Sequence, residues 1–278
     1  MYEAFFGLQE NPFTLSPDPK YLYLSDRHRE ALNYLVYGIQ ERKGFVVITG
    51  DIGAGKTTLC RALLSSLNGS VETALIFNSF LSEIELLETI NQEFGLPPGT
   101  GERSRKRLLD ALNAYLLANY GEGKNAVLLI DESQNLSHGV LEQIRMISNL
   151  ETVREKLIQI VLIGQPELQD VLAMPALRQL NERITVRYHL GPLERADVGR
   201  YIDHRLTVAG RGRAAFTSWS YRTIYRYSRG VPRRINAICD RAMLIAYTQE
   251  KVRIGAGLVR RAVRDLGGYG ETGGVSRK

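Results

Sequence analysis

Five short runs along the chain are rich in β-branched and other large apolar residues. They predict β-strands at 45–49, 73–78, 126–130, 158–163 and 184–190. The middle runs are almost unbroken in Val, Ile and Leu, as in strands that are buried on both faces. Between the runs, apolar residues recur at helical spacing, which predicts helices at 26–43, 59–67, 82–94 and 104–120. This alternation indicates an α/β core, a parallel sheet covered by helices on both faces.

The pattern changes after Leu190, where Gly191-Pro192 interrupts it. Helices are expected at 194–209, 217–229, 232–249 and 256–266, and no strand is expected there. Glycine and polar residues at the end of the chain predict a tail. The expected organisation is an N-terminal segment with the first helix at 1–44, an α/β core at 45–190, a helical lid domain at 191–267 and a flexible tail at 268–278.

The composition is that of a folded globular protein, with 24% charged and 44% hydrophobic residues among 278. No apolar run approaches the roughly 20 residues that span a bilayer. The first residues lack the basic and apolar regions of a secretory signal. Cys60 and Cys239 have no metal-ligand spacing and are expected as buried thiols. These features together predict a cytosolic protein.

Charge is distributed unevenly. Residues 191–278 carry 18 Lys plus Arg against 7 Asp plus Glu, a net of +11, whereas residues 1–190 carry 18 against 23, a net of −5. Such a basic region suits a nucleic acid, an anionic membrane, or arginines that serve nucleotides and neighbouring subunits. The four histidines form no spaced metal set, and Trp219 is expected in the core.

A glycine-rich loop follows the first predicted strand and precedes a predicted helix. It matches G-x-x-x-x-G-K-[ST] through Gly50, Asp51, Ile52, Gly53, Ala54, Gly55, Lys56, Thr57 and Thr58. Glycines let backbone N–H groups point inward around a phosphate, and the helix N-terminus adds positive potential. We expect Lys56 to reach the β- and γ-phosphates and Thr57 to give its hydroxyl to Mg²⁺. The loop therefore predicts a nucleoside triphosphate site.

Polar residues follow three of the other predicted strands. Asp131 and Glu132 end the third, where Asp131 is expected to hold Mg²⁺ and Glu132 to polarise an attacking water. Gln165, after the fourth strand, is the candidate for contacting the γ-phosphate and the water. Asn78, at the end of the second, is a candidate for restraining Glu132, and an ordinary loop role for it remains open. The order Asp-Glu favours a hydrolase over a nucleotide-monophosphate kinase.

Two arginines are candidates for stabilising charge on the γ-phosphate. A guanidinium placed there contributes roughly 10³ to 10⁵ in rate. Arg183 precedes the fifth strand, where oligomeric ATPases place an arginine finger that faces the neighbouring subunit, and Arg178 is the alternative. Arg233 lies in the first turn of a helix that starts at Pro232, from which it is expected to reach the nucleotide when the lid closes.

These motifs together look like an AAA+ ATPase of the P-loop class, with a five-stranded core and a helical lid. Further strings resemble the secretion ATPase family ExeA/GspA over residues 1–267. They are Met1-Tyr2, Phe6-Gly7-Leu8, Asn11-Pro12-Phe13, Ser16-Pro17-Asp18-Pro19, residues 21–32, Gly164-Gln165-Pro166-Glu167-Leu168, residues 188–193 and Cys239-Asp240-Arg241-Ala242. Pilus-biogenesis and exopolysaccharide-export ATPases share most of them. Ser133 and Glu182 depart from the family pattern of Ala and Gln without removing a catalytic group.

The resemblance implies an ATPase that uses ATP and Mg²⁺ to help assemble a bacterial envelope machine, through peptidoglycan remodelling for a secretin. It implies a homo-oligomer, a dimer or ring, with a finger arginine in trans. It also implies an inner-membrane partner. Family members continue into a transmembrane helix and a periplasmic region, so the expected place is the cytosolic face of the inner membrane if this protein continues in the same way, with a soluble paralogue as the alternative. Pro12, Phe13 and Tyr201 are implied as walls of the adenine site, with core packing as the equal alternative.

A second interpretation comes from a different class, the AAA+ regulators of DNA transposition. Its support is the basic C-terminal region, with Arg211, Arg213, Arg222, Arg226 and Arg229. DNA affinity that falls steeply with salt would favour it. Tyr221, Tyr225 and Tyr227 in the same region suit either a core or a partner surface.

Overall fold

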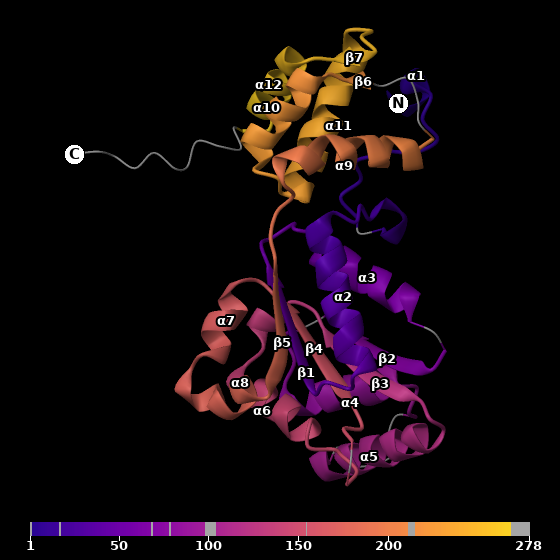
Figure 1. Ribbon diagram of the computed structural model, residues 1–278, viewed down its shortest axis with the longest axis vertical. Coiled ribbons are helices and arrows are strands. Elements are labelled where there is room, and N and C mark those ends of the chain that lie inside the picture. Colours follow the sequence, from indigo (N-terminus) through magenta and orange to yellow (C-terminus); the bar gives the residue numbers. More distant parts are fainter. Residues whose placement is uncertain are drawn as a thin grey trace, which may run out of the picture. The chain divides into compact units, whose positions relative to one another are not determined.

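The computed structural model describes residues 2–16, 18–67, 69–77, 79–97, 104–153, 155–210 and 215–267 (Figure 1). Two compact units divide the chain. We call them the lid unit, made of Met1–His28, Asp51–Leu59 and Gly191–Lys278, and the sheet unit, made of Arg29–Gly50 and Cys60–Leu190. The phosphate loop thus belongs to the lid unit, and the strand that precedes it belongs to the sheet unit. The predicted tail, 268–278, lies outside the described residues.

The sheet unit is built on five parallel strands in the order β2-β3-β4-β1-β5. They are β1 (Phe45–Gly50), β2 (Val71–Ile76), β3 (Asn125–Ile130), β4 (Gln159–Gly164) and β5 (Ile184–Leu190). This confirms the predicted α/β core. The second strand runs two residues earlier than predicted and ends at Ile76, so Asn78 is not part of it and lies outside the described residues.

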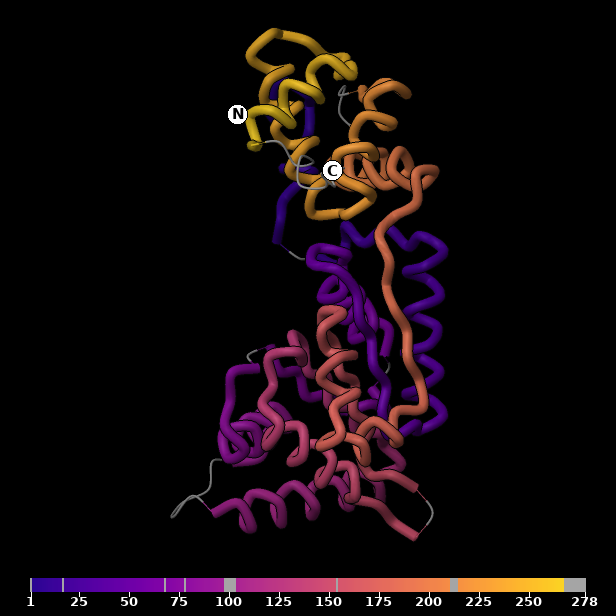
Figure 2. The backbone as a smooth tube through the Cα atoms, turned by 90° about the vertical axis from the view of Figure 1, so that its left-hand side faces the viewer, coloured from indigo at the N-terminus to yellow at the C-terminus, as the bar shows by residue number. Residues whose placement is uncertain are grey.

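Helices cover both faces of the sheet (Figure 2). On one face, alternate strand residues such as Val47 and Leu128 share a buried core with α4 (Glu83–Glu93), α5 (Arg105–Gly121), α6 (His138–Ile147), α7 (Glu167–Leu172) and α8 (Arg178–Glu182). On the other face, α2 (Asp26–Gln40) approaches so closely that a Cβ on Gly38 would lie 2.5 Å from Val46. The chain after the phosphate loop forms α3 (Lys56–Ser66). The three short helices α6 to α8 were not predicted.

The lid unit has its own apolar core. Its elements are α1 (Tyr2–Phe6), α9 (Arg195–Val208), α10 (Ser218–Ser228), α11 (Pro232–Thr248) and α12 (Ala256–Asp265), and residues of all five join Phe13 and Tyr21 in one buried cluster. Cys239 belongs to it, and both cysteines are buried and free, as predicted. Within the described residues, no helix is both long and apolar enough to cross a membrane.

Two expectations for the lid unit are wrong. A short parallel pair, β6 (Ala215–Phe216) and β7 (Arg253–Ile254), lies where no strand was expected, because two residues are too few to show an alternating pattern. Trp219 is 69% exposed rather than in the core. The inward face of α10 is taken by Ser220, Ile224 and Ser228, and Trp219 lies on the other side of the helix.

Candidate functional site

The phosphate loop has the backbone that its glycines predict. Gly53 has φ of +79° and Gly55 has φ of +101°, values in the left-handed region that favours glycine. A Cβ on Gly53 would lie 2.6 Å from the Cβ of Arg233, and one on Gly55 would lie 3.3 Å from Nε2 of His28. The backbone conformation therefore favours glycine at both positions, and at Gly53 the close approach of Arg233 favours it as well.

Two residues of the lid unit hold the loop through its carbonyl groups. The backbone N–H of Arg233, in the first turn of α11, donates to the carbonyl of Gly53 at 3.3 Å. Nε2 of His28 lies 3.2 Å from the carbonyl of Ala54. Since that oxygen only accepts, Nε2 carries the hydrogen, which leaves Nδ1 to accept from the Ser25 hydroxyl at 2.7 Å. Burial lowers the pKa of His28, consistent with a neutral ring.

His28 is a residue that the sequence analysis missed, since a surface or packing role was considered sufficient for every histidine. It is 3% exposed and stands at the start of α2, far from the loop in sequence. No local pattern connects the two segments. The arginine expected to reach the nucleotide, Arg233, is brought to the loop by its backbone, and its side chain is exposed.

Lys56 and Thr57 begin α3 at the end of the loop. Lys56 is 6% exposed, and its ammonium group donates to the carbonyl of Asp51, within the same loop, at 3.2 Å. The side chain is thus held over the loop rather than extended into solvent. A positively charged ammonium group held over the loop favours an anion there.

The second group of candidates lies in the sheet unit, directly after β3 and β4. Asp131 is 4% exposed, and Oδ1 accepts from the backbone N–H of Glu132 at 2.9 Å. One oxygen of the Glu132 carboxylate, Oε2, accepts from Nε2 of Gln165 at 3.1 Å and from Nε2 of Gln134 at 2.6 Å. The structure thus brings together Glu132 and Gln165, which are 33 residues apart.

Gln134 is a second residue that the sequence analysis missed. Its amide group donates to Glu132, while its Oε1 accepts from the backbone N–H of Gln165 at 2.9 Å. It therefore links the two candidate residues and fixes the distance between them. Glu132 itself has φ of +51°, an unusual backbone for a non-glycine residue that turns the chain sharply after the strand. The only sequence signal for Gln134 is its place in the turn after the two acids.

These residues lie at one edge of the sheet. Because β3, β4 and β1 are parallel neighbours, their carboxyl ends at Ile130, Gly164 and Gly50 share that edge, and the phosphate loop leaves β1 there. In open α/β sheets, ligands bind at the carboxyl ends of the strands. A Cβ on Gly50 would lie 2.6 Å from the carbonyl oxygen of Leu190 in β5, so glycine is also required where the loop starts.

Protein side chains alone supply only part of the ligands that a magnesium ion needs. The described residues contain no group of three or more His, Cys, Asp or Glu side chains that could hold a metal. Mg²⁺ in phosphate-transfer sites keeps several waters and uses one or two carboxylates together with substrate phosphates. The buried carboxylate of Asp131 is compatible with such a site.

The candidate finger arginines differ in their surroundings. The guanidinium of Arg183 donates from NH1 to the hydroxyl of Ser148 at 2.9 Å and to the carbonyl of Arg145 at 3.4 Å, at the C-terminal end of α6. These acceptors are neutral, and a helix C-terminus favours a cation. Arg178, the alternative, is 80% exposed and forms an i,i+4 ion pair with Glu182, which is typical of a solvated surface group.

The implied adenine walls lie in the lid unit core. Phe13 is 1% exposed and packs edge-to-face on Phe216, and Tyr201 is 5% exposed. The hydroxyl of Tyr201 donates to Asn236 at 2.8 Å. The carbonyl of Pro12 accepts from Arg205, a buried arginine of α9. These contacts are those of packed core residues.

Comparison with known proteins agrees with this architecture. The family described as "AAA domain" matches residues 39–172. General secretion pathway protein A from Aeromonas hydrophila is 49% identical over 273 residues, which are 98% of this chain and 50% of that protein. This chain therefore spans about half the length of the curated relative that it matches.

Solved structures share the fold at low identity. Cdc6p from Pyrobaculum aerophilum is 16% identical, with a TM-score of 0.71, over 92% of this chain and 70% of its own. ORC2 from Aeropyrum pernix is 19% identical, with a TM-score of 0.67, over 92% of this chain and 72% of its own. RuvB from Thermotoga maritima is 16% identical, with a TM-score of 0.57, over 87% of this chain and 70% of its own. The chain has the AAA+ P-loop ATPase fold and is related over nearly its whole length to general secretion pathway protein A.

Proposed function

We propose that this chain binds and hydrolyses ATP with Mg²⁺, and that Glu132 is the general base. The observation that carries the proposal is the Glu132 carboxylate, held by the amides of Gln134 and Gln165 at the sheet edge where the phosphate loop begins. The two amides orient the carboxylate, which then accepts a proton from the water that attacks the γ-phosphate. Hydrolysis then gives ADP and phosphate.

Other residues have supporting roles in this proposal. The backbone amides of residues 50–58 and Lys56 hold the β- and γ-phosphates, and Thr57 and Asp131 hold Mg²⁺, which when bound neutralises charge on the phosphate oxygens. Gln165 positions the water beside Glu132. The contact of Arg233 with Gly53 supports a role for this arginine near the phosphates.

The process that turnover serves is proposed from the relative. Similarity to general secretion pathway protein A supports a role in type II secretion, with an inner-membrane partner and a cytosolic location at that membrane. Pilus or exopolysaccharide export is the alternative within the same class. A regulator of DNA transposition is the alternative from a different class; of its five arginines, Arg222, Arg226 and Arg229 are exposed, and Arg211 and Arg213 lie outside the described residues.

Turnover by two variants tests the base. Glu132→Gln keeps the side-chain volume and removes the carboxylate, so we expect it to bind ATP normally and to lose at least about 100-fold in kcat, the usual range for a general base. Glu122→Gln is the control, because Glu122 is an exposed acid paired with Lys124 at the end of α5. Glu132→Gln with the turnover of the wild type would exclude Glu132 as the base.

Mixing variants tests whether Arg183 acts in trans. Its guanidinium donates to neutral groups at the end of α6, among them the side chains of Ser148 and Asn149, and a γ-phosphate of a neighbouring subunit would displace these contacts. We expect Arg183→Ala to be inactive alone, and its mixture with Glu132→Gln to recover part of the activity, since one interface of a mixed oligomer then has both groups. Mixed oligomers without any recovery would contradict a finger in trans.

A further inference from the structure

One tryptophan and two arginines lie on the exposed face of α10, and a third arginine follows the end of the helix. Trp219 is 69% exposed, and Arg222, Arg226 and Arg229 are exposed as well. Their spacing of three and four residues places Trp219, Arg222 and Arg226 within about 60° of the helix circumference and over about 10 Å of its length. Arg229, with φ of +53°, is the residue that directly follows the helix. We call these four residues the α10 stripe.

Ion pairs with the described residues do not neutralise the charge of the stripe. Arg222 lies over the Trp219 ring at 4.8 Å, and none of the three arginines has an ion pair with a described residue. Burial of Ile224, Ser220 and Ser228 on the opposite side of α10 fixes which face is turned to solvent. A fixed, unpaired row of guanidinium groups is complementary to a surface of phosphate groups.

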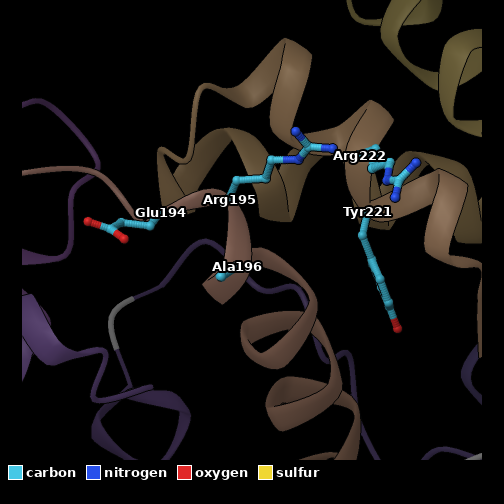
Figure 3. A pocket seen from close by; sticks show the side chains of 5 residues that line it. All are labelled: Glu194, Arg195, Ala196, Tyr221 and Arg222. Carbon is cyan, nitrogen blue, oxygen red and sulfur yellow. The ribbon is translucent and has the colours of Figure 1, made fainter.

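A pocket of about 500 Å³ extends this surface to α9. It is lined by Glu194, Arg195, Ala196, Tyr221 and Arg222, and Figure 3 shows the Arg195 side chain extending toward the side of the pocket that holds Arg222. The one acid, Glu194, forms an ion pair with Arg27 at 3.0 Å, and Figure 3 shows it directed away from the two arginines. The pocket is therefore suited to a small anionic group.

We propose that the α10 stripe and the Arg195 pocket dock on an anionic phospholipid surface, with lipid phosphates on the arginines and Trp219 at the interface. The choice of partner rests in part on the proposed secretion role. Tryptophan is enriched at membrane–water interfaces, and basic residues beside it bind anionic headgroups. Because the apolar side of α10 is packed in the core, docking is peripheral and the helix does not insert.

A nucleic acid fits the same surface less well. Single strands are held by several aromatic rings on which bases stack. In the described part of residues 191–267, Trp219 is the one exposed large apolar side chain, and Tyr221, Tyr225 and Tyr227 are packed against the core. One face of the Trp219 ring is also covered by Arg222. A Trp–Arg pair of this kind is no obstacle at a lipid interface.

The fluorescence of Trp219 reports docking directly, because it is the single tryptophan of the chain. Vesicles of equal parts phosphatidylglycerol and phosphatidylcholine are titrated without nucleotide, with pure phosphatidylcholine as reference. We expect the emission of Trp219 to shift to shorter wavelength with the anionic vesicles and not with pure phosphatidylcholine. The protein should also co-sediment with the anionic vesicles. A triple variant should weaken vesicle binding about 100-fold, roughly fivefold for each charge that is lost; it combines Arg222→Gln, Arg226→Gln and Arg229→Gln. Lysine at the same three positions keeps the charges and should restore binding.

A matched variant separates the stripe from net charge. Arg260→Gln with Arg261→Gln and Arg264→Gln removes three exposed arginines of α12, on the same unit, and should leave binding within a few-fold. Equal losses in the two triple variants would overturn the assignment. The absence of a fluorescence shift with anionic vesicles would also overturn it. A third contradicting result is a preference for a single-stranded oligonucleotide or for polyglutamate over anionic vesicles that persists at high salt. Since no nucleotide is present, these outcomes are independent of ATP hydrolysis.

Discussion

Single residues of the phosphate loop are fixed by contacts from distant parts of the lid unit. Gly53 accepts from the backbone of Arg233, and Ala54 accepts from His28. The loop therefore does not depend on its own sequence alone for its shape. Motif patterns identify the residues that would touch phosphate, whereas the residues that hold them in place require the fold.

The left-handed backbone of Gly53 leads to a prediction. A methyl group there would meet Arg233 Cβ at 2.6 Å and force φ of +79° on an alanine, so Gly53→Ala should cost about 1–3 kcal/mol in unfolding free energy and weaken ATP binding. Gly257→Ala in α12, where the new Cβ meets nothing, should be neutral or stabilising. Urea denaturation compares the two, and similar midpoints for both would contradict the account.

His28 leads to a prediction about pH. Burial lowers its pKa in the folded state below the ordinary value near 6.5, so the unfolded chain binds the proton more readily. Stability is therefore fully present above about pH 6.5 and falls as pH decreases below it. His204, whose pKa burial also lowers, contributes with the same sign. Unfolding midpoints between pH 8 and pH 5 should fall less in His28→Asn than in the wild type; equal slopes would exclude His28 as a source.

At the scale of elements, one buried arginine is among the contacts that join the N-terminal segment to the helices of the lid unit. Arg205 of α9 donates to the carbonyls of Pro12 and, at 3.3 Å, Thr14, and to the hydroxyl of Tyr201 at 3.1 Å. Its guanidinium also lies over the Tyr21 ring at 4.4 Å. These contacts use the planar fork of arginine, which lysine does not reproduce.

Arg205→Lys should therefore destabilise the protein by about 2–4 kcal/mol, because several hydrogen bonds to a charged group are lost and carbonyls stay buried. Arg200→Lys is the control on the same helix, since Arg200 is 70% exposed and its contact with Asp197 is 3.7 Å long. The measurement is the unfolding midpoint together with the rate of proteolysis near residues 8–16. Equal behaviour of the two variants would contradict the role of Arg205.

The same scale shows which elements a sequence predicts. The strands β1, β3 and β4 were predicted within one residue at each end, because unbroken Val, Ile and Leu leave few alternatives. The β6–β7 pair was missed because it consists of two residues on each side, held by contacts between segments almost 40 residues apart. Trp219 was misplaced because an aromatic residue on a helix is usually buried, and its exposure depends on which face of α10 packs.

At the scale of the whole molecule, the sheet order brings the candidate groups to one edge. Glu132 and Gln165 were predictable from their positions after strands, but the amide of Gln134 that joins them was not, because the link requires β3 and β4 to be neighbours. The predicted ATPase chemistry combines this edge with the phosphate loop that leaves β1. Everything proposed for turnover depends on nucleotide binding by that loop.

Calorimetric titration of Glu132→Gln with ATP and Mg²⁺ tests this claim most directly, since binding is then measured without turnover. We predict saturable uptake of one nucleotide for each chain, with loss of at least about tenfold in affinity when Lys56→Ala removes the ammonium group from the phosphates. Folding of both variants is checked by their unfolding midpoints. A folded Glu132→Gln protein that takes up no nucleotide with the metal present would contradict the account.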